Sequence, residues 1–178
     1  MGLIEHWDRI LAWLAEHAPA TRAVLRPGSD VRLDLEVPAD LRRWWNQFGG
    51  TTDFAEILPP FYSPLGADRA VELRERFRPF FTGDLPSQAG TPIAGFHREW
   101  LPIAFDGIGD VLAVDLRPGA LRGCVVEWDR EKREMVKPEW NSVADMFDEV
   151  ATALETRGRL GHCQPVVNSA GELSWYTD

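Results

Sequence analysis

The amino-terminal part of the chain has the spacing of an amphipathic α-helix. Its apolar residues recur every three or four positions, which places them on one face of a helix. They are Ile4, Trp7, Ile10, Leu11, Trp13 and Leu14. Pro19 ends the pattern, because proline lacks a backbone N–H and clashes with the preceding helical turn. The sequence therefore predicts a first helix that ends before Pro19 and packs through this face.

Two further helices are expected before residue 80, separated by a proline-rich segment. Their apolar positions are Leu41, Trp44, Trp45 and Phe48 in the first and Ala70, Leu73 and Phe77 in the second. Pro38 lies near the start of the first helix and Gly49 ends it, as is typical of helix boundaries. Residues 57–66 contain three prolines, which favour an edge strand or an extended loop. The second helix is expected over residues 67–80.

An antiparallel meander is predicted between residues 100 and 140. Apolar segments alternate there with turn segments rich in glycine or charged residues. The apolar segments are residues 100–105, 111–116, 124–129 and 135–140. Residues 82–98, which precede the meander, have the composition of a loop.

A last helix is expected over residues 141–155. Its apolar face comprises Val143, Met146, Phe147, Val150, Ala151 and Leu154. Ser142, followed three residues later by Asp145, has the pattern of an N-terminal capping box. Beyond it, a hairpin with a turn at residues 169–171 is expected to place Trp175 and Tyr176 on its second strand. The order of elements predicts an α+β fold, with N-terminal helices and a C-terminal helix packed against a central, mainly antiparallel sheet.

Length and composition predict one folded domain over residues 1–178. Apolar residues make up 44% of the chain and charged residues 26%, which is ordinary globular usage. Glu5 and Asp8 interrupt the segment that a secretory signal would keep apolar, and no apolar run approaches the roughly 18 residues of a membrane helix. We therefore expect a cytoplasmic protein that makes no use of a membrane.

The net charge of −9 is unevenly distributed along the chain. Residues 101–150 contain eleven Asp or Glu and six Lys or Arg, so this segment alone contributes −5. A surface of that sign repels phosphate backbones and attracts basic proteins. Nucleic acid is therefore not expected as a partner, whereas a basic protein is. An acidic excess that serves only solubility would have the same composition.

Cysteine and histidine give no sign of a metal or redox site. Cys124 and Cys163 lie 39 positions apart and neither belongs to a CxxC pair. His6 and His17 are too far apart along one helix to share an ion. No cofactor and no metal are expected.

The segment from Asp106 to Asp110, sequence DGIGD, admits both a chemical and a structural interpretation. It lacks the lysine and the following helix of a phosphate-binding loop, and it supplies too few oxygen ligands for calcium. Paired acid catalysis remains open, with Asp110 and either Asp115 or Glu127 as partners across the sheet. The stronger interpretation is a hairpin turn, since Asp-Gly is a common turn signal and glycine accepts positive φ.

Tryptophan occurs eight times. Trp7 and one of the Trp44/Trp45 pair lie on helical faces and are expected in the core. Candidates for recognition are the other member of the pair, Trp100, Trp128, Trp140 and Trp175, since exposed tryptophan anchors interfaces and stacks on sugars. Each of them also fits a structural role.

The order of these elements resembles the SUKH superfamily, which contains the fungal cell-wall-assembly regulator of the Smi/Knr type and many bacterial relatives. The resemblance covers roughly residues 5–156, leaving residues 157–178 as a C-terminal extension. Its most specific part comprises Trp100, Pro102, Asp106, Gly107, Gly109, Asp110 and Asp115. The helix with Pro38 and the Gly49-Gly50 stop is a weaker match.

The resemblance implies a binding module without catalytic activity. Bacterial relatives resemble immunity proteins that neutralise nuclease or deaminase toxins by direct binding, so a basic toxin domain is the expected partner. In this interpretation an acidic, tryptophan-bearing face of the sheet and its turns covers the active site of the toxin. The seven matching residues either contact the partner or define the turn. A regulatory scaffold and a carbohydrate-binding or hydrolytic domain are the alternatives, and the oligomeric state stays open.

Overall fold

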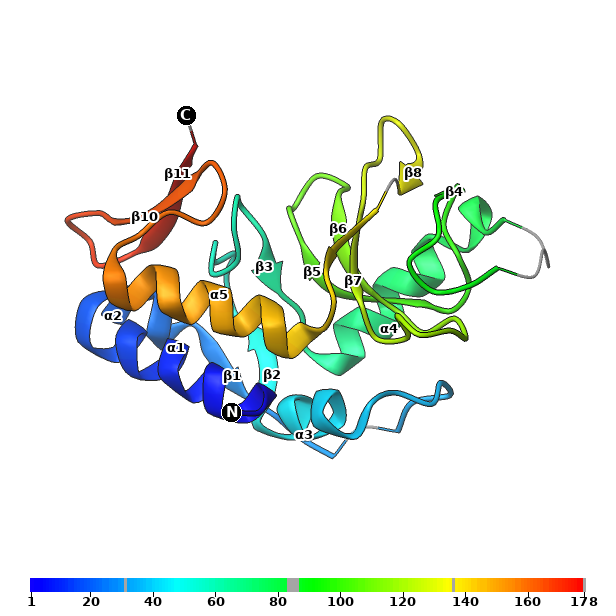
Figure 1. Cartoon of the computed structure of the whole chain (residues 1–178). Helices are drawn as coiled ribbons and strands as arrows, with labels where there is room; N and C mark the ends of the chain where they lie inside the picture. Colours follow the sequence, from blue (N-terminus) through cyan, green and yellow to red (C-terminus); the bar gives the residue numbers. More distant parts are fainter. Residues whose placement is uncertain (31, 83–86, 136, 178) are drawn as a thin grey trace.

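A five-stranded antiparallel sheet forms the centre of the molecule (Figure 1). The computed structural model describes residues 1–30, 32–82, 87–135 and 137–177. The strands follow the order β3-β5-β6-β7-β9. Their bounds are β3 (Ser63–Pro64), β5 (Trp100–Phe105), β6 (Val111–Asp115), β7 (Val125–Trp128) and β9 (Pro138–Trp140). The predicted meander is thus confirmed, and residues 57–66 supply the edge strand β3.

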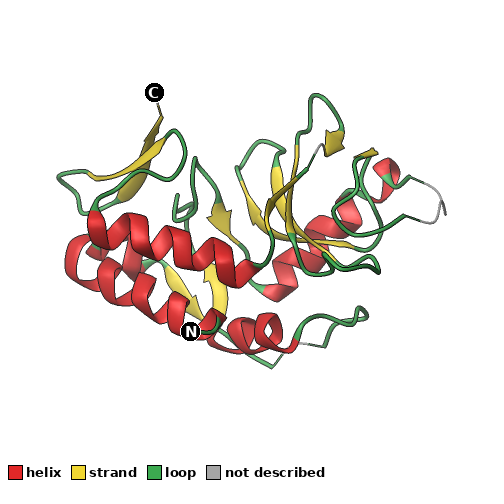
Figure 2. Cartoon of the chain, in the orientation of Figure 1, coloured by secondary structure: helices red, strands yellow, loops and turns green. Residues whose placement is uncertain are grey.

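Helices pack around this sheet, as the α+β prediction requires (Figure 2). They are α1 (Leu3–His17), α2 (Pro19–Ala23), α3 (Ala39–Gln47), α4 (Ala67–Arg76), the 3-10 helix η1 (Arg78–Phe80) and α5 (Val143–Thr156). Helices α1 and α5 lie side by side and run in the same direction (Figure 1). Arg9 of α1 joins them, since its guanidinium donates to Asp148 and Glu155 of α5 at 2.6 Å each. None of the helices in the described ranges is long and apolar enough to cross a bilayer.

Three two-stranded sheets surround the central one, and two of them were not predicted. They pair β1 (Leu25–Pro27) with β2 (Phe48–Thr51), β4 (Ile93–Ala94) with β8 (Glu134–Met135), and β10 (Cys163–Val167) with β11 (Leu173–Thr177). Phe48, expected on a helix, instead begins β2, because Gly49 lies against the backbone of Pro27 and Gly50 has a positive φ of 93°. The expectation of a helix through Phe48 was therefore wrong.

Two further expectations need correction. Residues 135–140 do not form one strand, because β8 pairs away from the central sheet with β4 while β9 pairs with β7. Residues 82–98, expected as a loop, contain β4. Val136 and residues 83–86, which belong to these two segments, lie outside the described residues.

Two aromatic clusters fill the core. Trp7 contacts Trp44, Phe48 and Phe147 between the helices. Phe77 of the α4 end and Phe96 pack against Trp128 of β7, with ring centroids 4.9 Å and 5.6 Å apart. All residues of β6 are buried, so both faces of this strand are covered.

The tryptophans therefore belong to the interior. Seven of the eight are buried, including both Trp44 and Trp45, and Trp140 is half-buried. The indole of Trp45 donates to the carbonyl of Leu65 at 2.9 Å. The expected tryptophan-bearing binding face is thus wrong, because burial of these large rings stabilises the core and leaves only Trp140 partly exposed.

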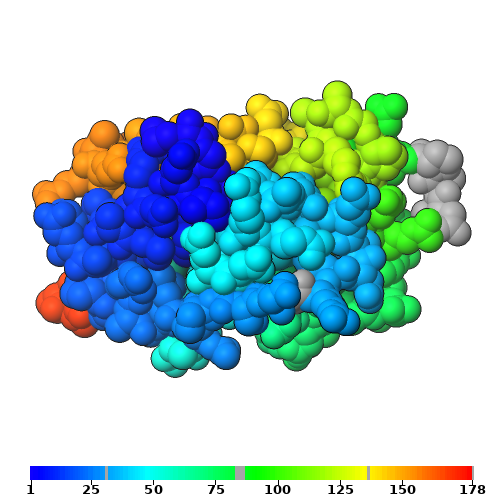
Figure 3. Space-filling view, turned by 90° about the horizontal axis from the view of Figure 1, so that it is seen from below, coloured from blue at the N-terminus to red at the C-terminus, as the bar shows by residue number. Residues whose placement is uncertain are grey.

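The carboxyl-terminal hairpin packs against the amino-terminal helices. The carbonyl of Gly171, in its turn, accepts the N–H of Ala20 at 3.0 Å. The N–H of Leu173 donates to the hydroxyl of Thr21 at 2.8 Å. Seen from below, the blue and cyan amino-terminal segments cover the left and centre of this side of the molecule, and part of the red-orange carboxyl-terminal segment appears at its left edge (Figure 3).

Helix α5 begins at the predicted cap, where the hydroxyl of Ser142 accepts the N–H of Asp145 at 3.0 Å. Replacing Ser142 by alanine leaves this donor without its side-chain partner, so the free energy of unfolding is expected to fall by about 1 kcal/mol. Urea denaturation measures the change. Ser142→Asp restores an acceptor and serves as the matched control, and equal stability of the alanine and aspartate variants would contradict the capping role.

Candidate functional site

Six of the seven residues of the sequence motif lie in two groups at opposite ends of the β5–β6 hairpin, and Pro102 pairs with Ala113 between them. At one end Trp100 pairs with Asp115, and at the other end Phe105 pairs with Val111 and the turn begins. Trp100 and Phe105 are five positions apart on β5, which is about 17 Å at the rise of a β-strand. The motif therefore forms two separate sites.

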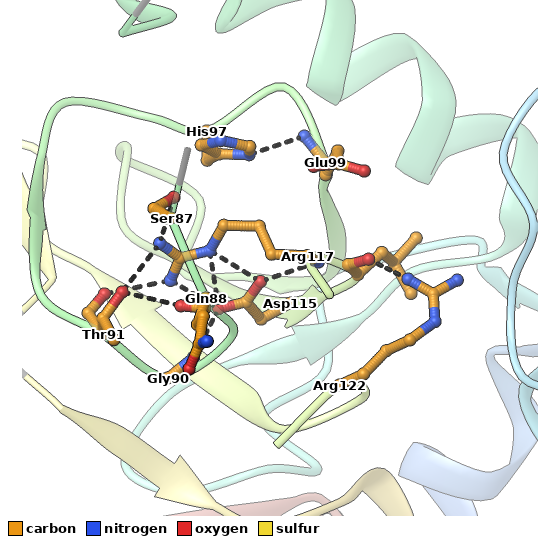
Figure 4. Close-up of polar contacts among 10 residues, drawn as sticks. Ser87, Gln88, Gly90, Thr91, His97, Glu99, Asp115, Arg117 and Arg122 are labelled. Carbon is orange, nitrogen blue, oxygen red and sulfur yellow. Dashed lines mark hydrogen bonds and ion pairs between the residues drawn. The ribbon is translucent and has the colours of Figure 1, made fainter. Parts of the chain in front are cut away.

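At the end of the hairpin formed by Trp100 and Asp115, which we call the inner end, a buried ion pair joins Asp115 and Arg117 (Figure 4). Both side chains have no exposed surface. The guanidinium Nη2 donates to Asp115 Oδ2 at 2.6 Å, and Nε lies 3.0 Å and 3.1 Å from the two carboxylate oxygens. The same carboxylate accepts the N–H of Gly90 at 2.9 Å. Asp115 therefore anchors a loop that lies 25 residues before it in the chain.

Arg117 fixes the same loop through its remaining donors. Its Nη1 donates to the hydroxyl of Ser87 at 2.9 Å, and its Nη2 donates to the carbonyl of Thr91 at 2.9 Å (Figure 4). Its guanidinium also lies 5.5 Å from the ring centroid of Trp100. Because each nitrogen has a partner within the chain, this group is a structural latch and offers no open position for a ligand.

His97 lies beside the latch and accepts the N–H of Glu99 through Nδ1 at 3.1 Å (Figure 4). Burial, together with the positive charge of Arg117, lowers the pKa of its imidazole. The ring therefore acts here as a neutral acceptor that holds the chain before β5.

At the outer end, Asp106 organises the turn. Its Oδ1 accepts the backbone N–H of Ile108, Gly109 and Asp110 at 2.9, 2.7 and 2.9 Å. Gly107 and Gly109 have φ values of 90° and 153°, which favour glycine. A Cβ on Gly109 would also lie 2.1 Å from the Cδ of Arg130. These contacts give the turn one defined conformation.

Asp110 links this turn to the residues that directly follow β7. Its Oδ1 accepts the N–H of Arg130 at 2.8 Å, and Arg130 Nη1 donates to the carbonyl of Ile108 at 2.7 Å. Burial raises the pKa of Asp110, and the nearby charges of Asp106 and Asp129 raise it further. Among the residues that the structure describes, no three His, Cys, Asp or Glu side chains come together as a metal would require.

Of the two paired-acid arrangements, the structure supports proximity only for Asp110 and Glu127. Asp115 lies at the far end of β6 and is held by Arg117. Glu127 lies on β7, where Tyr62 donates its hydroxyl to Oε1 at 2.5 Å. Burial raises the pKa of Glu127, and the charges of Glu139, Asp110 and Asp129 add to the effect. Burial and the Glu127 charge likewise raise the pKa of Tyr62, which keeps this hydroxyl protonated.

Sequence reasoning missed Arg117 and Tyr62. Arg117 stands two residues after Asp115, just beyond the end of β6, where its backbone N–H also donates to Asp115 Oδ1 at 3.1 Å. That spacing was the available signal for the ion pair. Tyr62 lies 65 residues from Glu127, and only the pairing of β3 with the sheet brings them together.

The raised pKa of Glu127 predicts a pH-dependent effect of Glu127→Gln. Between the ordinary value of 4.5 and the raised value, the folded chain holds this proton more tightly than the unfolded chain, so stability falls as pH rises. The amide removes this cost and still accepts from Tyr62. We expect the variant to gain about 0.5–1 kcal/mol at neutral pH. Thermal unfolding from pH 4 to pH 8 measures this, and an advantage that does not shrink toward pH 4 would contradict it.

Exposed apolar residues surround the outer turn. Ile108, at the tip of the turn, is 77% exposed, and Phe54, in the loop before β3, is 52% exposed. A Cβ built on Gly107 would lie 3.4 Å from the ring of Phe54, so this ring lies against the turn. Phe61, next to Tyr62, is 43% exposed. We call Phe54, Phe61, Gly107 and Ile108, together with Asp53, Glu56, Asp106 and Asp110, the turn face.

Residues 31–149 match the family model described as the SMI1 / KNR4 family (SUKH-1). The matched segment contains the central sheet, the latch and the whole turn face. Helices α1 and α2 and the β10–β11 hairpin lie outside it. No curated protein is significantly similar to the chain in sequence.

Proposed function

Since the chain belongs to the SMI1 / KNR4 family (SUKH-1), we propose that it is a non-catalytic, cytoplasmic immunity protein. It neutralises a toxin of the nuclease or deaminase type by binding the toxin domain directly. The observation that carries this proposal is the turn face, where exposed apolar side chains stand among carboxylates on a rigid turn.

Charge supports a basic partner. The protein carries −9 overall, and the carboxyl of Asp110 lies close enough to Asp106 and Asp129 that their charges add to the effect of burial in raising its pKa. Enzymes that act on nucleic acids bind phosphates through Lys and Arg, so their active sites are positively charged. A surface of opposite sign steers association with such a site and competes with its substrate.

The hydrogen bonds that the candidate acids already make within the chain support a role without catalysis. Asp115 is saturated by the guanidinium of Arg117 and the N–H of Gly90. Oδ1 of Asp110 accepts the N–H of Arg130, and Oε1 of Glu127 accepts the hydroxyl of Tyr62. A general acid or base needs an accessible carboxyl group that points at a substrate.

The carbohydrate-binding alternative loses its main support. Protein surfaces stack sugars on exposed aromatic platforms, and tryptophan was the residue expected to provide them. Seven of the eight tryptophans are buried. The regulatory-scaffold alternative would use the same turn face with other partners.

Co-expression tests the proposal. The protein is produced together with each candidate nuclease or deaminase domain encoded by the genes beside its own, and growth of the host is measured with and without it. The proposal predicts restored growth and a stable complex of the two purified proteins. A toxin that kills equally in the presence of the protein, with no complex formed, would overturn it. A catalytically inactive toxin domain provides the matched control for binding.

A further inference from the structure

We propose that the turn face is the docking surface of this protein and that it takes a basic segment of a partner protein carrying a large apolar side chain. This inference rests on the proposed function for the identity of the partner. Its location and its chemistry come from the geometry of residues 53–61 and 106–110.

The apolar centre of the turn face is continuous. The ring of Phe54 lies against Gly107, and Ile108 follows at the tip of the turn. Phe54, together with Asp53, also lines two hollows of about 350 and 370 Å³. One hollow reaches toward Ala20 and Leu173, and the other reaches Gly66 and Phe105. A partner side chain can therefore enter on either side of this ring.

Hydrogen bonds within the chain fix the apolar centre of the turn face in the free protein. Three N–H donors of the turn bind Asp106, and Arg130 donates to the carbonyl of Ile108. On the Phe54 side of the contact between Phe54 and Gly107, the hydroxyl of Ser63 accepts the N–H of Ala55 at 3.2 Å. Binding to a preorganised surface loses less conformational entropy, so exposed side chains contribute more of their contact energy.

The charges around this centre select a cation. Asp53 is exposed, and Glu56, Asp106 and Asp110 are half-buried. The cations nearby are Arg26 and Arg69, which line one hollow, and Arg130. Arg69 is paired with Glu72 at 2.6 Å, and Arg130 is held by the turn. The carboxylates therefore outnumber the cations at the rim, and a basic segment complements it.

A second exposed apolar group lies on the carboxyl-terminal hairpin and provides a matched control. Val166 and Tyr176 are 42% and 59% exposed there. They lie outside the segment that matches the family, whereas Phe54 and Ile108 lie inside it. Substitutions at the two places remove similar exposed side chains and differ only in location.

Selection of displayed random peptides on the full-length protein tests the inference without knowledge of the partner. We expect the selected peptides to carry an excess of Arg and Lys with at least one large apolar residue. Phe54→Ala and Ile108→Ala should each weaken their binding about tenfold, as expected of central interface residues. Asp53→Lys should weaken it as well, with Asp8→Lys on α1 as its control. Tyr176→Ala and Val166→Ala should leave it unchanged.

Selected peptides that are neutral or acidic would overturn the inference. The inference would also be overturned if Tyr176→Ala or Val166→Ala weakened peptide binding. It would be overturned as well if no selected peptide lost affinity for the Phe54→Ala or Ile108→Ala variant. Circular dichroism confirms that each variant is folded. If peptides bind the turn face but the toxin is not neutralised, only the proposed function fails. If the toxin is neutralised by both alanine variants as well as by the wild type, only the docking surface fails.

Discussion

Replacing Arg117 by methionine is expected to lower the free energy of unfolding by about 3–5 kcal/mol. The substitution leaves the carboxylate of Asp115 in the interior, where neither group has any exposed surface, without the cation that compensates it. It also removes the donors that hold Ser87 and Thr91. Urea denaturation measures the loss. Hydrogen exchange should show faster exchange of the Gly90 N–H, which binds the same carboxylate.

The double variant Asp115→Leu with Arg117→Met separates the charge effect from the loss of packing. It removes both charges, so no buried ion stays uncompensated, and it is expected to be more stable than the Arg117→Met variant. If the double variant were at least as unstable as the single variant, the packing of these side chains, and not the pairing of their charges, would be what the latch contributes to stability. The ion pair would then not be the group that fixes the 87–91 loop.

Replacing Trp7 by alanine is expected to cost about 3–5 kcal/mol as well. The indole is 1% exposed, and its ring lies 5.5 Å from that of Trp44, 5.0 Å from Phe48 and 5.1 Å from Phe147. Its removal leaves a cavity between α1, α3 and α5. Ile108→Ala, at an exposed position, is the control and should change stability by less than about 0.5 kcal/mol. A small effect at Trp7 would mean that α1 is not part of the core.

The elements with a strong local period could be predicted from the sequence. The apolar spacing of α1 and α5 predicted both helices, and Ser142 predicted the start of the second. The alternation of apolar segments with Asp-Gly and Pro-Gly turns predicted the order of β5, β6 and β7. Local patterns suffice here because each of these elements packs a face that its own sequence defines.

The elements that depend on distant pairing could not be predicted. Strand β4 has two residues and exists because Ile93 and Ala94 pair with Met135 and Glu134, about forty residues away. Strand β2 replaces the expected end of a helix because Gly49 approaches β1 closely at Pro27. Propensity is a weak guide when such tertiary contacts decide the conformation.

The candidate site was only partly visible in the sequence. The glycine-aspartate turn was predicted from its residue types, but the burial of Asp115 depends on Arg117 and on a loop that lies 25 residues earlier. The exposure of Phe54 and the burial of the tryptophans follow from how the helices cover the sheet. The spacing of residues along the chain does not indicate which aromatic side chains are buried by neighbouring elements and which stay exposed.

The central claim is that an acidic, apolar turn face recognises a basic protein. Titration calorimetry of the purified protein with the toxin domain that it neutralises in the co-expression test is the most direct measurement, performed at low and at high salt. We expect a stable complex whose affinity falls as salt screens the charges, and falls again in the Ile108→Ala variant. A complex that is indifferent to both salt and Ile108 would contradict it.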